Sequence, residues 1–241
     1  AMTQEIYLGA DETKTVYFIL TADQRVCYEL KEEDMPRLKG LSKKYFVSLA
    51  PLTIKTDEPE MDMLVNNWLM YQVISSRMNG RCGFYQAGGA IGFRDQLQDC
   101  LAMMYTDRKR AGEMLLDCAA HQYEEGDVMH WWHPPAYGVR TRISDDKLFL
   151  GYVAAQYVKH TGDRGILSRQ ARYLSSQPLQ PMQESRLEHG RYGELKEDVL
   201  SHILRGIDNA LVYGKHGLLL IGCGDWNDAL NGIGDEGRGM A

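Results

Sequence analysis

The sequence lacks several features that would assign a protein to a class at once. It has no run of about 18 apolar residues, so none of its helices is expected to span a membrane. Its N-terminus has no basic stretch followed by an apolar run, so no signal peptide is visible. Lysine and arginine form no cluster, and the formal net charge is −6. That balance argues against nucleic acid or an anionic membrane surface as the main partner.

Cysteine is scarce and widely spaced. The number is odd and no CxxC pair occurs, which argues against a disulfide framework and against a zinc knuckle. We expect free, buried thiols in a reducing compartment, and therefore a cytoplasmic protein. The five residues concerned are Cys27, Cys82, Cys100, Cys118 and Cys223.

The composition is that of an ordinary globular protein. The chain has 241 residues, of which 44% are hydrophobic and 25% charged. This length predicts one large domain, or one domain with a smaller piece attached. It begins with Ala1 and Met2 and stops after a Gly-rich stretch at 232–239, so we expect both ends to be internal to a longer protein.

The N-terminal region is predicted to contain β structure. Residues 16–20 form a short apolar run rich in β-branched and aromatic side chains, and a turn-like segment at 9–12 precedes them. Because one or two strands do not fold alone, residues 1–30 are interpreted as the end of a β domain that lies upstream. Residues 31–56 are charged and mixed, and are interpreted as a linker.

From residue 57 the pattern becomes helical. Asp57 and Glu58 precede Pro59, which is typical of a helix start. Leu64, Trp68, Tyr71 and Ile74 recur at three- and four-residue spacing and predict one apolar face. Further helices are expected near 94–105, 108–122, 146–160 and 195–213, separated by long loops at 80–93, 124–144, 161–193 and 214–241. Alternating helices and long loops favour an α/α toroid whose loops build the site on one face.

The loop at 222–228 is the most informative. Gly222 and Gly224 free the backbone for a close approach, and Asp225, Trp226, Asn227 and Asp228 follow directly. An indole face matches the C–H face of a pyranose, and a carboxyl two residues later can address a glycosidic oxygen. A capped turn, in which Asp225 or Asn227 satisfies backbone donors, is the alternative.

The loop at 126–146 carries two tryptophans, two histidines, two arginines and several aspartates. Guanidinium and carboxylate groups bind vicinal hydroxyls while rings stack on apolar sugar faces, so this density fits sugar recognition. His130 and His133 form an HxxH pair, but no third ligand and no HExxH pattern is evident, so no metal site is predicted. Ser144 is a candidate helix cap, with Asp146 pointing inward.

A Gly-rich segment at 84–96 precedes a predicted helix. It lacks the GxxxxGK[ST] order and the βαβ context of a phosphate-binding loop, so we reject that reading. Arg94 and Asp95 either pair as a structural salt bridge or line the pocket.

Three long motifs together carry a family resemblance. They are FYQAGGAIGFRDQLQD at 84–99, HQYEEGDVMHWWHPPAYGVRTRISDD at 121–146 and HGLLLIGCGDWNDALN at 216–231. With them, nearly the whole of 45–241 resembles the inverting glycoside phosphorylases that include cellobiose and chitobiose phosphorylases. The nearest likeness is to the branch shared with the phosphorylase-like region of cyclic β-1,2-glucan synthases.

The resemblance implies a mainly α protein: the last strands of an N-terminal β-sandwich at 1–30, a linker at 31–56, and a truncated (α/α)6 barrel at 57–241. It implies that Asp228 is the general acid and that Trp226, Arg140 and Asp146 bind the sugar, Arg140 and Asp146 as a hydroxyl-binding pair. Asp225 and Arg94 are further candidates for binding the substrate, on the composition of their own loops. Family members usually have Gly-Met after the acid, whereas Ala229 and Leu230 stand here. The family's phosphate-binding residues lie beyond this segment, so the segment alone is expected to be inactive.

The reaction implied is phosphorolysis of a β-linked gluco-oligosaccharide or disaccharide with inversion, giving α-glucose 1-phosphate. Inorganic phosphate is the co-substrate and no cofactor is needed; a homodimer of the intact protein is compatible with the resemblance. Two alternatives stay open. One is an inverting hydrolase, which needs a second carboxylate such as Asp146 or Asp95. The other is a non-catalytic sugar-binding or chain-length-controlling region of a glucan synthase.

Overall fold

The computed structural model describes residues 5–16, 18, 31–48, 53–80, 88–181 and 183–224. The chain divides into two compact units, residues 1–46 and 47–241. The boundary between them falls inside the segment interpreted as a linker. No helix among the described ranges is long and apolar enough to cross a lipid bilayer.

The first unit contains a turn and a helix. The turn is where the sequence predicts it, because the N–H of Glu12 donates to the carbonyl of Gly9 at 3.2 Å. Residues 5–16 otherwise form no strand, and most of the predicted strand at 16–20 lies outside the described residues. A short 3-10 turn, η1 (Glu32–Asp34), leads into α1 (Met35–Ser48), a helix that the sequence analysis did not anticipate within the linker.

The second unit begins with four helical segments in succession. They are α2 (Pro59–Met63), the π-helical η2 (Leu64–Trp68), α3 (Leu69–Gln72) and the π-helical η3 (Val73–Asn79). Pro59 is the first helical residue, as predicted. The expected single apolar face is only partly correct: Ile74 and Met78 are buried, whereas Leu64 and Trp68 are about half exposed, at 47% and 48%. A π-turn holds more residues than an α-turn, so the two π segments rotate the 3.6-residue pattern away from one face.

Four further helices match their predicted positions. They are α4 (Phe93–Met103), α5 (Arg108–Ala119), α6 (Asp146–Thr161) and α7 (Val199–Ala210). Asp107 and Asp198 cap α5 and α7 by accepting from backbone N–H groups, and Gly162, with φ +75°, ends α6. Helix α4 packs on α5 and α6, and α6 packs on α7. Their facing sides form the hydrophobic core, centred on Phe93, Leu97, Leu115, Leu150 and Val153.

Cys100, Cys118 and Cys223, the cysteines that the structure describes, form no disulfide, as predicted, and Cys27 and Cys82 lie outside the described residues. Cys100 and Cys118 lie in the core. Burial raises the pKa of the Cys100 thiol to about 12, so it packs as a small apolar group.

Strands occupy two segments that were predicted to be loops. The predictions for 124–144 and 161–193 were wrong, because β2 (Met129–His133), β3 (Tyr137–Thr141), β4 (Gln170–Ser175) and β5 (Ser185–His189) lie there, and β6 (Arg191–Asp198) begins there. With β1 (Ile91–Gly92), they form an antiparallel sheet in the order β1-β2-β3-β5 and an antiparallel pair, β4-β6. Strands β5 (SRLEH) and β6 (RYGELKED) consist mostly of polar residues, and β2 (MHWWH) has adjacent aromatic residues, so these strands lack the apolar alternation from which strands are predicted.

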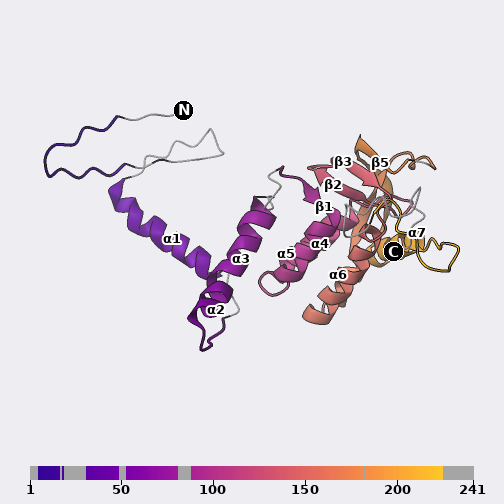
Figure 1. Ribbon diagram of the computed structural model, residues 1–241, viewed down its shortest axis with the longest axis horizontal. Coiled ribbons are helices and arrows are strands. Elements are labelled where there is room, and N and C mark those ends of the chain that lie inside the picture. The colour runs from indigo at the N-terminus through magenta and orange to yellow at the C-terminus, as the bar shows by residue number, and fades with distance from the viewer. Residues whose placement is uncertain are drawn as a thin grey trace. The chain divides into compact units, whose positions relative to one another are not determined.

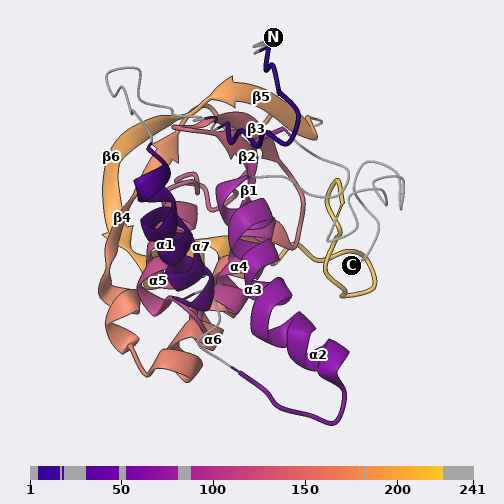
Figure 2. The same ribbon diagram turned by 90° about the vertical axis from the view of Figure 1, so that its left-hand side faces the viewer.

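The four-stranded sheet positions two helix starts. Strand β1 pairs with β2, with Gly92 opposite Trp131, and α4 begins at the next residue. Strand β3 leads through residues 142–145 into α6. The sheet therefore lies at the N-terminal ends of α4 and α6 (Figures 1 and 2). Within the described residues, the fold combines predominant helix with antiparallel sheet.

Candidate functional site

The described chain ends immediately before the residues predicted to perform the chemistry. Asp225, Trp226 and Asp228 lie outside the described residues, which stop at Gly224. The structure does place the first part of that loop, Gly222 to Gly224, and what this part touches.

The loop packs directly on the segment that precedes α6. The backbone N–H of Ser144 donates to the carbonyl of Gly224 at 3.0 Å, and the Ser144 hydroxyl lies 3.4 Å from the same oxygen. Gly222 adopts φ +66°, and a Cβ there would collide with the Arg142 carbonyl. Only glycine fits so close an approach with this φ. The expectation that Ser144 caps α6 was wrong, because Asp145 occupies the N-cap position.

A buried charged cluster lies two residues from this contact. Nη1 of Arg94, at the start of α4, is 2.9 Å from Oδ1 of Asp145 and 3.6 Å from Oδ1 of Asp146. Oδ2 of Asp146 is 2.7 Å from Nδ1 of His130 on β2. Asp146 has no exposed surface, and Arg94 is 6% exposed. The Arg94 cluster, as we call Arg94, His130, Asp145 and Asp146, thus joins α4, β2 and α6.

The Asp146 carboxylate can accept a further hydrogen bond through one of its oxygens. Oδ1 of Asp146 is buried and forms no hydrogen bond in the described structure. A buried carboxylate oxygen without a donor is costly, so in a native protein it calls for an explanation such as a catalytic role or a bound water or ion. Arg94 and the positive end of the α6 dipole stabilise negative charge here. A neutral donor such as a sugar hydroxyl would complete the coordination of this oxygen.

Arg140 lies in a different network. Its guanidinium bonds Asp127 through Nε and Nη2, both at 2.6 Å, and Glu125 through Nη2 at 2.8 Å. Its Nη1 bonds Ser176 and the carbonyl of Gln177, both at 3.2 Å, and its Cζ lies 3.8 Å from the centroid of the Tyr123 ring. Arg140 is 1% exposed, so all five N–H donors are directed at protein groups.

These contacts determine the direction in which the pKa of Arg140 is shifted. Burial alone would lower its pKa, but the bonds to Asp127 and Glu125 outweigh burial and raise it. The described contacts do not bring Arg140 and Asp146 together as a pair. Arg94, expected to pair with Asp95 or to line the pocket, contacts Asp145 and Asp146.

The aromatic and histidine residues of the same region have separate positions. Trp132 is buried and stacks on His121 at 3.9 Å between ring centroids, so it belongs to the core. His133 packs edge-on against Trp131 at 5.9 Å. His130, weighed earlier only as half of an HxxH pair, is instead the partner of Asp146. Among the residues that the structure describes, no group of three metal-ligating side chains occurs.

The sequence places this arrangement in a known class. Residues 47–240 match the family described as the glycosyl hydrolase 94 superfamily, catalytic domain. The chain therefore belongs to that superfamily, and the resemblance to glycoside phosphorylases and glucan synthases is confirmed.

Individual relatives are longer proteins. The chain is 35% identical to the cyclic beta-(1,2)-glucan synthase NdvB of Rhizobium meliloti (strain 1021), over 95% of this chain and 8% of that protein. It is 30% identical to the solabiose phosphorylase of Paenibacillus borealis, over 86% and 23% of the two chains. It is 23% identical to the N,N'-diacetylchitobiose phosphorylase of Vibrio furnissii, over 82% and 26%. The chain thus spans about a quarter of each phosphorylase's length, and less of the synthase.

Proposed function

We propose that this chain forms the sugar-binding and general-acid part of an enzyme that cleaves a β-linked gluco-oligosaccharide with phosphate. The reaction inverts the anomeric centre and gives α-glucose 1-phosphate. Asp228 donates the proton to the leaving oxygen, and Trp226 stacks on the sugar. The Arg94 cluster, through Asp146, receives ring hydroxyls.

One observation carries the proposal. The hydrogen bond from Ser144 to Gly224 fixes the residue before Asp225 at a point two residues from Asp146. Consecutive Cα atoms are about 3.8 Å apart, so the segment 225–228, which carries Asp228, starts within reach of the buried carboxylate of Asp146. The orphan oxygen of Asp146 supplies an acceptor for a hydroxyl at that place. Family membership supports the same assignment.

A single acid suffices for phosphorolysis. An inverting hydrolase must activate water with a second carboxylate on the opposite face of the sugar. Phosphate already carries negative charge at neutral pH and attacks the anomeric carbon directly, so only the leaving oxygen needs a proton. For that role Asp228 must be protonated before attack, which requires burial or a neighbouring carboxylate such as Asp225.

The architecture proposed for the whole domain is an (α/α)6 barrel, to which α4 to α7 contribute part. Residues 1–30 are proposed as the end of a β-sandwich and 31–56 as a linker. The helix contacts and the long connections between helices support the barrel. We propose a cytoplasmic enzyme with inorganic phosphate as co-substrate and no cofactor.

A second function is favoured by one relative. The glucan synthase matches 95% of this chain, whereas the other two relatives named above match less. The chain is then a region that binds the growing glucan within a synthase, without cleaving it. A hydrolase on the same barrel is the third possibility, with Asp146 or Asp95 as the base.

The test uses the complete reading frame and a β-linked glucose disaccharide. We expect release of glucose 1-phosphate only when phosphate is present, and loss of turnover in Asp228→Asn with sugar binding retained. Asp208→Asn, an exposed aspartate on α7, is the control for changing a carboxylate to an amide.

The outcomes separate the three functions. Cleavage that needs no phosphate identifies a hydrolase. Saturable binding of the sugar without cleavage, with or without phosphate, identifies the binding region of a synthase. Full activity of the Asp228→Asn variant removes Asp228 from its role.

A further inference from the structure

A cavity lies beside the 142–147 segment and residues 222–223. Its volume is about 380 Å³, within the range of about 300–1,000 Å³ common for small-molecule pockets. Its lining includes Arg142, Lys147, Gln183, Glu184, Asn209 and Val212, and none of the four residues of the Arg94 cluster. Ser144, Gly222 and Cys223 also line it, so the cavity borders the contact between residues 222–224 and the segment before α6.

Lys147 is the most unusual group in this cavity. It is the second residue of α6, where the helix dipole is positive and a cation is unfavourable. Within the described part of the chain, its ammonium forms neither a hydrogen bond nor an ion pair. Burial lowers its pKa, and the nearby Arg142 acts in the same direction, while Asp127, Asp146 and Cys223 raise it. A partly buried cation in this position has no ion-pair partner among the described residues.

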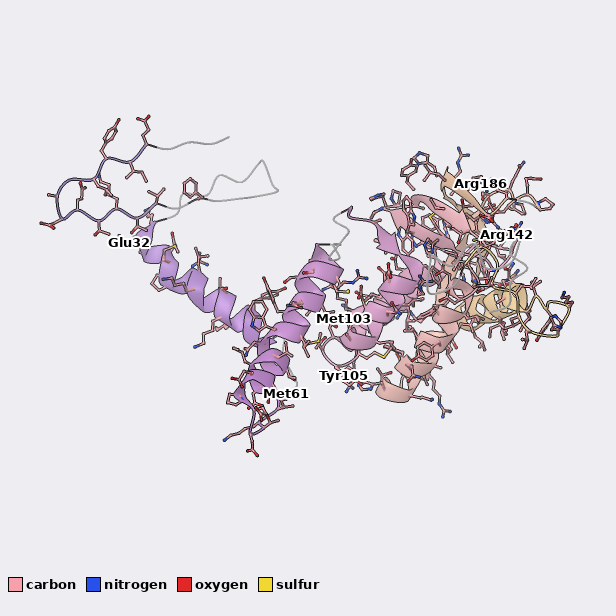
Figure 3. All side chains as sticks on the ribbon, in the orientation of Figure 1. Glu32, Met61, Met103, Tyr105, Arg142 and Arg186 are labelled. Atoms are coloured by element: carbon pink, nitrogen blue, oxygen red, sulfur yellow. The ribbon has the colours of Figure 1, made fainter. Side chains whose placement is uncertain are left out.

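Arg142 adds a second cation with spare donors. Its Nε bonds the carbonyl of Gln183 at 2.9 Å, and its Nη2 bonds the carbonyls of Leu179 and Gln180 at 3.1 and 2.9 Å. Its Nη1 has no acceptor among the described residues. Figure 3 labels Arg142 near Arg186, at the end of the sheet formed by β3 and β5. The guanidinium is therefore held in place by three carbonyls and still offers N–H groups.

The remaining walls suit a polyhydroxylated molecule. Gln183 and Asn209 offer amides, and Glu184 offers a carboxylate that can accept from hydroxyls. Val212 provides an apolar surface. An inorganic anion alone would contact the two cations but would leave the amides, the carboxylate and the apolar wall without a ligand group to bind.

We propose that this cavity binds a saccharide that carries one anionic group, with Lys147 and Arg142 holding the anion and the amides and Glu184 holding hydroxyls. The anionic group is a carboxylate, as in a sugar acid, or a phosphate, as in a sugar phosphate. The cavity borders the proposed active site, but this proposal assigns no role to Asp228, Trp226 or the Arg94 cluster, so the two proposals can fail separately.

The test is isothermal titration calorimetry with four probes: D-glucuronate, glucose 6-phosphate, glucose and inorganic phosphate. We expect saturable binding of glucuronate, glucose 6-phosphate or both, at least tenfold tighter than glucose or phosphate. The first two probes distinguish the carboxylate from the phosphate. Lys147→Met should weaken this binding at least tenfold, because it removes the charge and keeps the apolar stem.

Lys159→Met is the matched control, since Lys159 lies exposed near the other end of α6. It should bind like the wild type. A second readout needs no variant: after reductive ¹³C-methylation of the lysines, NMR should show the pKa of Lys147 rising with glucuronate or glucose 6-phosphate, and not with glucose.

Several results would overturn the proposal. Equal affinity for glucose means that the anion is not recognised. Equal affinity for inorganic phosphate means that the sugar part of the probe is not recognised. Unchanged binding by Lys147→Met, or a pKa of Lys147 that does not respond to the bound probe, places the ligand elsewhere. Absence of binding by all four probes refutes it as well.

Discussion

The backbone N–H of Ser144 donates to the carbonyl of Gly224 across 3.0 Å, joining residues 80 positions apart in the sequence. Ser144 leads into α6, which opens on the buried carboxylate of Asp146. Gly224 directly precedes the segment that carries Asp225, Trp226 and Asp228. This one bond connects the two motifs on which the proposed function rests, so several predictions concern it.

Replacing Gly222 by alanine should disturb that connection. The added Cβ would collide with the Arg142 carbonyl, and φ +66° is unfavourable for alanine. We expect faster hydrogen exchange at the Ser144 amide and a loss of stability in urea unfolding of at least about 2 kcal/mol.

Gly217→Ala is the matched control. Gly217 has φ +75° in the same region, but a Cβ there meets no atom within 4 Å. The Gly217→Ala protein should lose only about 1–2 kcal/mol in the free energy of unfolding, because of backbone strain at this φ. Hydrogen exchange at the Ser144 amide should stay unchanged. Equal effects of the two substitutions would show that the contact with Arg142 is unimportant.

Arg140→Met tests whether Arg140 is structural. The substitution leaves Asp127 and Glu125 without their buried cation, so we expect a loss of about 3–5 kcal/mol in the free energy of unfolding. Arg186→Met breaks the more exposed pair with Glu188, 2.7 Å long, and should cost about 1 kcal/mol. A stable Arg140→Met protein that no longer binds sugar would instead support the hydroxyl-binding role that the resemblance implies.

Asp146→Asn should separate binding from folding. The amide oxygen can still accept from His130, but the amide nitrogen faces Arg94 and the negative charge is gone. We expect glucose affinity, measured by calorimetry on the complete reading frame, to fall at least tenfold, or about 1.4 kcal/mol. Asp208→Asn should leave affinity unchanged. Unaltered affinity in Asp146→Asn would remove this carboxylate from the sugar site.

His202 should make stability depend on acid. It is fully buried, its ring stacks on Tyr173 at 3.8 Å between centroids, and burial lowers its pKa from 6.5 to about 4. Between these two values the unfolded chain binds the proton and the folded chain does not, so stability rises with pH. The contribution is complete above pH 6.5 and is lost as the pH falls to about 4, by up to about 3 kcal/mol.

Urea unfolding from pH 4 to 7 measures this effect. His202→Gln should flatten the dependence relative to the wild type, whereas His189→Gln, at an exposed position, should not. A His202→Gln protein with the same slope as the wild type would assign the acid sensitivity to other groups.

The sequence predicted the parts of the fold that local patterns control. Helices α4 to α7 lie close to the segments predicted to be helical, and Pro59 marked its helix start. The strands were missed because β2, β5 and β6 consist largely of polar or aromatic residues that show little alternation. Their pairing comes from backbone hydrogen bonds with distant segments, which no local window contains.

The candidate site was predictable in its residue types and less so in its pairings. Density of charge and aromatic rings identified the 126–146 loop. The spacing of residues in the sequence could not show that Arg140 forms ion pairs with Asp127 and Glu125. Nor could it show that His130 and Arg94 contact Asp146. Those choices depend on strand register and on which helix start lies beside which strand. For His130, the available indication was that this histidine lies in the same 126–146 segment as Asp146, which was predicted to point inward.

The pairing of Gly92 with Trp131 limits which sequence changes the His130–Asp146 contact can tolerate. Successive side chains of a strand point to opposite faces, so a shift of one residue between β1 and β2 would turn His130 away from α6 and present Met129 or Trp131 in its place. An insertion or deletion inside β2, between His130 and Trp131, therefore threatens the Asp146 contact as surely as a substitution of His130. Variation in this region should be confined to replacements that preserve the length of the chain.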